Sequence, residues 1–137
     1  MKIEDVLFGV IEEKIGVTKK EILSKSRLSN IVDARRIFAV ILFRSSSLTL
    51  MRVGKRVDRD HSTVVFYNKS HNSLVKTDKF FREKYNSINE EFKELMRSSI
   101  PLEIRLVKAI EDREKIDKEI VKLKELIEIK KEQLSSV

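Results

Sequence analysis

The stretch SLTLMRVGKRVDRDHSTVVFYNKSHNSL, residues 47–74, contains two helical patterns separated by a short turn. Thr49 is placed to cap a helix that runs to about Val57, and Asp60 is placed to cap a second helix that begins directly after it. Two short helices joined by a tight turn form a helix-turn-helix, in which the first residues of the second helix face base edges in the major groove of DNA. The stretch therefore predicts this motif, with RDHST at residues 59–63 as the part that contacts the bases.

Two helices, a basic loop and a third helix are expected before the motif. The first helix carries an apolar stripe and ends near Gly16. Thr18 and Glu21 have the spacing of a capping box at the start of a short second helix. Residues 24–30, SKSRLSN, are polar and basic without helical periodicity, whereas residues 31–46 have the pattern of a strongly buried third helix. The basic segment is thus expected to be an exposed loop between buried helices.

The composition of the 137 residues favours an all-α protein with one compact domain and an extension. Hydrophobic residues make up 41% and charged residues 37%, with only three glycines and one proline. Because cysteine is absent, a disulfide framework and a thiolate metal site are excluded, and the reducing cytoplasm is the expected location. No apolar run approaches the length of a membrane span, so no membrane partner is predicted.

The net charge of +7 is concentrated in the first half of the chain. Residues 1–75 hold 14 Lys or Arg against 8 Asp or Glu, whereas residues 76–137 hold 15 against 14. Phosphate backbones attract a basic domain because its binding releases counterions. A basic surface alone is modest evidence for nucleic-acid binding, since many basic proteins have no nucleic-acid partner. The sequence motifs therefore have to show whether this domain binds DNA.

Three segments resemble the C-terminal DNA-binding domain of the DnaA family of bacterial replication initiators. They are ILSKSRLSNIVDARRIFAVILFR at 22–44, SLTLMRVG at 47–54 and RDHSTV at 59–64, and the likeness extends over about residues 3–75. The last family motif is usually RDHTTV, so Ser62 replaces a threonine. The resemblance implies a helix-turn-helix domain that binds a short double-stranded DNA site of the DnaA-box type.

The resemblance also implies roles for individual residues. Arg27 matches a loop arginine that enters the minor groove, and Arg44 matches a basic residue that contacts phosphate. The four residues from Asp60 to Thr63 match the base-reading cluster. Their chemistry agrees, because aspartate can accept from the cytosine amino group, the threonine methyl can contact the thymine methyl, and arginine suits a narrow minor groove. The predicted DNA-binding residues are Lys25, Arg27, Arg44, Thr49, Arg59, Asp60, His61, Ser62, Thr63 and Lys69.

Each of these residues also has a simpler interpretation. Asp60 can be an N-cap without a ligand, and His61 taken alone is an ordinary surface imidazole. Arg27 and Arg44 taken singly are solvated charges, because surface arginines rarely have partners of consequence. Their joint placement favours a DNA-binding surface. No role is assigned to Arg35, Arg36 or His71.

An enzyme is the other interpretation of Asp60 and His61, which can be drawn as a proton-transfer pair. Adjacent residues of a helix point about 100° apart, however, and no nucleophile or second acid has a supporting spacing. The 137 residues contain no GxxxxGK[ST] motif, so the ATPase module of the full initiator is not expected in them. Two histidines without cysteine do not favour a zinc site. The sequence predicts no catalytic residue, no cofactor and no metal.

The second half contains two further helical patterns, one before and one after Pro101, which is placed to open the last helix. The first has an apolar seam of Phe81, Tyr85, Ile88, Phe92 and Leu95. The second has a heptad pattern between charged flanks, with Leu106, Ile120, Ile127 and Leu134 in one position and Leu102, Ala109, Ile116 and Leu123 in the other. Arg113 and Lys130 interrupt this heptad seam.

These interruptions weaken a long parallel zipper, so two interpretations of the second half stay open. It can associate with a second copy or with a partner helix through residues 80–135, as a coiled coil. Alternatively, the last helix can fold back as an antiparallel hairpin on the face formed by residues 81–95. The expected domains are residues 1–76 for DNA binding and residues 77–137 for this interaction arm.

The sequence therefore predicts an all-α protein, with a helix-turn-helix bundle followed by long helices. Its expected function is sequence-specific binding of double-stranded DNA in replication initiation, in the regulation of replication, or in transcription regulation. A bacterial, phage or mobile-element origin is expected. The alternative is a protein-interaction adaptor in which the coiled-coil arm carries the function, and salt-dependent duplex binding distinguishes the two.

Overall fold

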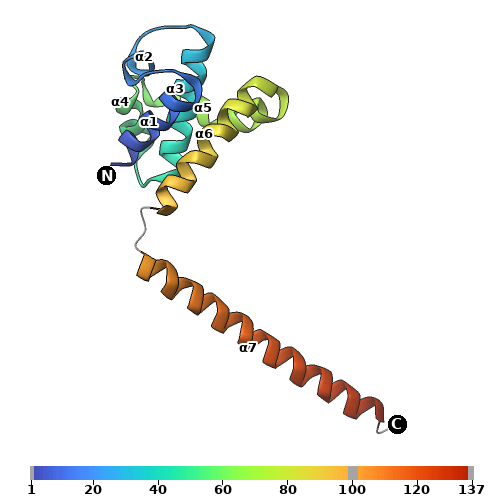
Figure 1. Cartoon of the computed structure of the whole chain (residues 1–137). Coiled ribbons are helices and arrows are strands. Elements are labelled where there is room, and N and C mark those ends of the chain that lie inside the picture. The colour runs from blue at the N-terminus through green and yellow to red at the C-terminus, as the bar shows by residue number, and fades with distance from the viewer. Residues whose placement is uncertain (1, 99–101, 136–137) are drawn as a thin grey trace. The chain divides into compact units, whose positions relative to one another are not determined.

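The computed structural model describes residues 2–98 and 102–135, which form seven helices and no strand (Figure 1). In chain order the helices are α1 (Ile3–Ile15), α2 (Lys19–Leu23), α3 (Ser29–Ser45), α4 (Leu50–Arg56), α5 (His61–Thr77), α6 (Lys79–Ser98) and α7 (Leu102–Ser135). The all-α prediction is confirmed. The chain divides into an N-terminal unit, residues 1–97, and a C-terminal unit, residues 98–137.

Helix α1 ends and helix α2 begins where the sequence predicts. Gly16 follows α1 with a φ of 71°, a left-handed conformation that glycine adopts without strain, and its N–H donates to Glu12 O at 3.0 Å. Thr18 and Glu21 form the expected capping box. Glu21 N donates to Thr18 Oγ1 at 3.2 Å, and Thr18 N donates to Glu21 Oε1 at 3.1 Å. These local bonds fix the short connection from α1 to α2.

Helix α3 forms the centre of the N-terminal unit. Its buried side chains include Ile37, Phe38 and Leu42, and α1, α2, α4 and α5 all pack against it. The rings of Phe38 and of Phe8 in α1 stack with their centroids 4.1 Å apart. Burial of this apolar surface stabilises the framework that holds α4 and α5 in place.

Helix α6 belongs to the same N-terminal unit. Phe81, Ile88 and Phe92 on one face of α6 are buried in the core that α3 centres, whereas Leu95 is exposed. In the hairpin interpretation, the last helix packs on the face formed by residues 81–95. In the structure, buried residues of this face pack on the core of the N-terminal unit. The N-terminal unit thus includes α6, which follows the boundary expected at residue 76, and the assignment of DNA binding to residues 1–76 stays a prediction.

His71 of α5 is buried and packs against α6. The ring of His71 contacts the rings of Phe81 and Tyr85, at centroid distances of 5.6 Å and 4.4 Å. Neither ring nitrogen of His71 has a hydrogen-bond partner among the described residues. Burial lowers the pKa of His71 to about 4, and the charges of Arg44 and Arg36 add to the shift. The imidazole is therefore neutral near pH 7 and packs as an apolar ring.

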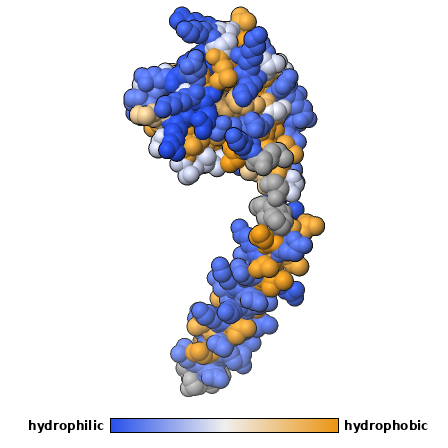
Figure 2. All heavy atoms as spheres, turned by 90° about the vertical axis from the view of Figure 1, so that its left-hand side faces the viewer, coloured by the Kyte–Doolittle hydropathy of each residue, from blue (hydrophilic) through white to orange (hydrophobic). Residues whose placement is uncertain are grey.

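Helix α7 is one continuous helix of 34 residues. Its large apolar side chains have exposed fractions of 43% to 77%, and Figure 2 shows hydrophobic and hydrophilic residues interspersed along it. Within residues 2–98 and 102–135, no helix is long and apolar enough to cross a membrane. Pro101, the expected first residue of this helix, lies outside the described residues. Pairing of α7 with another helix stays a prediction.

Candidate nucleic-acid interface

The turn between α4 and α5 depends on Gly54 and Asp58. Thr49 caps α4, because its Oγ1 accepts from Arg52 N at 3.3 Å. After α4 the chain reverses, and Arg59 N donates to Gly54 O at 2.8 Å. A Cβ on Gly54 would lie 2.5 Å from Arg59 O, so this close approach requires glycine. Asp58 has a left-handed φ of 54°, which a short polar side chain tolerates.

Asp60 caps the amino end of α5. Its Oδ1 accepts from His61 N at 2.8 Å and lies 3.2 Å from His61 Nδ1, while its Oδ2 accepts from Ser62 Oγ at 2.9 Å. The hydrogen bonds from the Ser62 hydroxyl and the His61 backbone hold the pKa of Asp60 below its usual range. The predicted cap is confirmed, and contact between Asp60 and a base stays a prediction.

The first turn of α5 is open to solvent, although the helix is anchored in the core. His61 and Ser62 are exposed and Thr63 is half-buried. On the opposite side, Val64 and Tyr67 are buried. A helix held by its inner face and exposed at its amino end suits contact with base edges and phosphates, because its first N–H groups and its dipole favour negative charge.

A buried arginine shapes the basic loop between α2 and α3, residues 24–28. The guanidinium of Arg35 in α3 donates to three backbone carbonyls around this loop. They are Ile22 O at 2.8 Å from Nε, Ser24 O at 2.8 Å from Nη2, and Ser26 O at 3.2 Å from Nη1. Burial lowers the pKa of Arg35, and the charge of Arg59 adds to this effect. The loop therefore wraps around a fixed cation and leaves its own basic side chains exposed.

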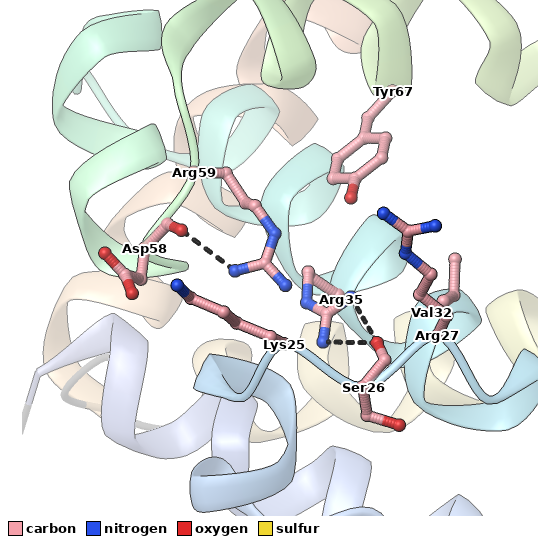
Figure 3. Close-up of a pocket in the computed structure, with 8 residues that line it drawn as sticks. All are labelled: Lys25, Ser26, Arg27, Val32, Arg35, Asp58, Arg59 and Tyr67. Carbon is pink, nitrogen blue, oxygen red and sulfur yellow. Dashed lines mark hydrogen bonds between the residues drawn. The ribbon is translucent and has the colours of Figure 1, made fainter.

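Arg59 connects the basic loop to the α4–α5 turn. Its Nη2 donates to Ser24 O at 2.7 Å, and its Nη1 donates to Asp58 O at 2.8 Å. The two segments border a cleft of about 410 Å³, in which Lys25 points toward the turn and Arg27 toward Tyr67 (Figure 3). The cleft is lined by Lys25, Ser26, Arg27, Val32, Arg35, Asp58, Arg59 and Tyr67. Several cations thus gather directly beside the start of α5.

The remaining predicted residues do not line this cleft. Arg44, near the end of α3, donates Nε to Asn68 Oδ1 at 3.0 Å, so it lies along the middle of α5, where Lys69 is exposed. Thr49 serves as the cap of α4. The predicted set therefore falls into a cluster at the start of α5 and a pair of cations farther along it. DNA contact by these residues stays a prediction. In the part of the chain that the structure describes, no three His, Cys, Asp or Glu residues are grouped to hold a metal ion.

Arg35 and Gly54 are the site residues that sequence reasoning missed. A signal for Arg35 was available, because it lies four residues after Ile31 and three before Phe38, on the buried face of its helix. Gly54 ends the segment SLTLMRVG that resembles the family, but its close approach to Arg59 O appears only in three dimensions.

Replacing Arg35 with lysine is expected to lower the free energy of unfolding by about 2 kcal/mol, because hydrogen bonds from a charged donor to buried carbonyls are lost. Lysine keeps the charge but lacks the rigid fork that reaches three separate carbonyls. Urea unfolding of the full chain measures the change. Arg52→Lys, at an exposed position of α4, is the control and should stay within about 0.5 kcal/mol of the original protein. Equal stability of the two variants would show that Arg35 does not hold the loop.

The comparison with known proteins agrees with this geometry. Residues 4–69 match the bacterial DnaA protein helix-turn-helix. The chromosomal replication initiator protein DnaA of Kosmotoga olearia is 34% identical over 89 residues, which cover 64% of this chain and 20% of that protein. Its counterpart from Flavobacterium psychrophilum is 30% identical over 87 residues, covering 63% and 18%. The protein of the same name from Streptococcus mutans is 43% identical over 65 residues, covering 46% and 14%. The chain thus spans a fifth or less of the length of these relatives. The family whose model these residues match, over just under half of this chain, is the bacterial DnaA protein helix-turn-helix.

Proposed function

We propose that the N-terminal unit binds double-stranded DNA at a short specific site. The observation that carries this proposal is the link made by Arg59, which joins the exposed first turn of α5 to the basic loop. One continuous surface therefore presents both a helix end and a set of cations. A helix end of this kind fits the major groove, and loop arginines fit the adjacent minor groove. The match of residues 4–69 to the bacterial DnaA protein helix-turn-helix supports the same function.

Residues of this surface have different roles in the proposed complex. His61, Ser62 and Thr63 contact base edges, and Arg27 enters the minor groove. The exposed cations Lys25, Arg44 and Lys69 contact phosphates, which orient the protein without reading sequence. Asp60 caps the amino end of α5 and also faces the bases. Arg59 connects the basic loop to the α4–α5 turn through its hydrogen bond to Ser24 O.

The proposed process is replication initiation, its regulation, or transcription regulation. The relatives that match are named chromosomal replication initiator proteins, which connects a site-specific binder of this family to the first two. Because this chain aligns with a fifth or less of their length, the proposal covers DNA binding and not the other parts of those proteins.

We also propose that α7 is a protein-interaction helix. Its apolar side chains lie at heptad spacing and are exposed in this single chain. Soluble proteins seldom expose a long apolar surface unless another protein covers it. A second copy of the chain and a different partner helix both satisfy this requirement. DNA binding by the N-terminal unit and helix pairing by α7 are compatible functions.

His61→Ala is expected to weaken binding to the best DNA site by about 1–3 kcal/mol and to have little effect on random duplex DNA. A group that reads a base contributes to the preferred site, whereas phosphate contacts are common to all sequences. Selection of bound duplexes from a random pool identifies the best site for the full chain. Fluorescence anisotropy then gives the dissociation constants of each variant on that site and on random duplex.

Lys79→Ala is the control for this experiment, because Lys79 is an exposed cation at the start of α6 and is not one of the residues proposed to contact DNA. It should change both dissociation constants by less than about 0.5 kcal/mol. An equal loss on the two DNAs for His61→Ala would contradict base reading by this residue. Absence of any enriched sequence in the selection would contradict specific binding altogether.

A further inference from the structure

We propose that α7 pairs with α7 of a second copy of this chain, and that the two helices run antiparallel. The charge of α7 indicates the kind of partner. The helix carries nine basic and nine acidic side chains, so the net charge of +7 lies entirely outside it. A helix that binds DNA phosphates or an anionic membrane surface needs an excess of Lys and Arg. A neutral helix with an apolar seam fits another helix of the same kind.

The seam of α7 repeats every seven residues over almost the whole helix. One heptad position is occupied by Leu106, Arg113, Ile120, Ile127 and Leu134, and the other by Leu102, Ala109, Ile116, Leu123 and Lys130. The large apolar members are all exposed in the single chain, and hydrophobic residues along α7 are visible in Figure 2. Only two of these ten positions carry a charge, so the placement of these two cations determines the orientation of a pair.

A parallel pair in register would bring like charges together. Arg113 would meet Arg113 of the second copy inside the seam, and Lys130 would meet Lys130. At the rim, Asp112 would face Asp117 of the second copy, although Glu119 would find Lys124. Burying like charges against each other in a desolvated seam is costly, because each loses water without gaining a counterion. The sequence of α7 therefore disfavours this orientation.

An antiparallel pair avoids like-charged layers in the seam. When Ile116 packs on Ile120 of the second copy, Arg113 faces Leu123 and Lys130 faces Leu106. Each long cationic side chain then lies along an aliphatic neighbour and extends its charge to the rim. There Arg113 comes within one turn of Glu119 of the second copy.

Lys130 has a matching acid in the same arrangement, because Glu103 of the second copy lies within one turn of it. Two acids, Asp117 and Glu119, do meet their own copies at the two-fold axis. These contacts are at the hydrated rim, where a charge pair changes stability little, and Arg113 lies close enough to offset one of them. The complementary charges therefore favour the antiparallel dimer.

An antiparallel dimer places the two amino ends of α7 at opposite ends of a paired rod about 50 Å long, from the rise of 1.5 Å per residue. Each amino end leads to one N-terminal unit. The dimer is thereby suited to engage two separate DNA sites, a consequence that rests on the DNA binding proposed above. The helix pairing itself does not rest on it and is measured without DNA.

Sedimentation equilibrium of the full chain tests the second copy as the partner. The original protein is expected at twice its mass of 16.1 kDa. Ile120→Glu, in the seam, should raise the dimer dissociation constant by roughly a hundredfold or more, because it buries unpaired charge. Val121→Glu is the matched control, since Val121 is a neighbouring exposed residue outside the seam, and it should leave the dimer intact. A monomer at the highest attainable concentration, or equal weakening by both variants, would overturn the proposal.

Disulfide crosslinking tests the orientation, and the absence of cysteine from the chain makes each introduced thiol unique. Leu106→Cys and Lys130→Cys are prepared separately in the full chain, mixed and oxidised. An antiparallel dimer should give a disulfide between the two variants, identified by mass spectrometry of the linked peptides, and little crosslinking of either variant alone. Efficient crosslinking of each variant with itself would establish a parallel pair and overturn the proposed orientation.

Discussion

Replacing Phe81 with alanine is expected to lower the free energy of unfolding of the N-terminal unit by about 3–5 kcal/mol. The Phe81 side chain is 1% exposed, lies in the same core as α3, and contacts His71 in α5. Alanine would leave a cavity that the surrounding helices fill only in part. Urea unfolding followed by tyrosine fluorescence measures the effect. Both tyrosines, Tyr67 and Tyr85, lie in the N-terminal unit and the chain has no tryptophan, so α7 does not contribute to the signal.

Phe80→Ala is the control, because Phe80 precedes Phe81 in α6 but is 74% exposed. Its free energy of unfolding should stay within about 0.5 kcal/mol of that of the original protein. Similar losses for the two variants would contradict the packing of α6 into the N-terminal unit. If Phe81 is needed as expected, a stable DNA-binding fragment has to include α6 and cannot end at residue 76.

The ends of the first helices could be predicted from sequence because local chemistry sets them. Gly16 ends α1 by adopting a left-handed conformation, and Thr18 and Glu21 bond to each other across three residues. Asp60 caps α5 through its own neighbours, His61 and Ser62. None of these contacts depends on a distant part of the chain.

The neighbour of α6 could not be predicted, because an apolar seam shows that a helix face is buried but not what covers it. The seams of α6 and α7 have similar spacing, so core packing and a hairpin look alike in the sequence. Long-range contacts make the difference. Tyr85 packs on the buried His71, and Lys84 pairs with Asp33 in α3 at 3.0 Å.

The residue types of the candidate site could be predicted from the sequence, but the hydrogen bonds that hold its segments together could not. The resemblance indicated Arg27 and the residues around His61, and no structural contact tests their binding to DNA. Ser24 O accepts from both Arg35 and Arg59, and this shared carbonyl joins the loop to the helix turn. Such convergence of distant segments on one backbone atom leaves no periodic signal in the sequence.

Affinity for duplex DNA is expected to fall roughly two-hundredfold when monovalent salt rises from about 50 to about 200 mM. The proposed surface carries four exposed cations, Lys25, Arg27, Arg44 and Lys69. Neutralising about four phosphates releases their counterions, which gives a log–log slope of affinity against salt near −4. Arg44→Ala removes one of these cations and should make the slope shallower by about one.

The most direct test of DNA binding by the N-terminal unit is this salt titration of the full chain on duplex DNA, read by fluorescence anisotropy. A linear log–log plot with a slope near −4 is the expected result. A flat plot, or no binding at the lowest salt, would contradict DNA binding and leave protein interaction through α7 as the function.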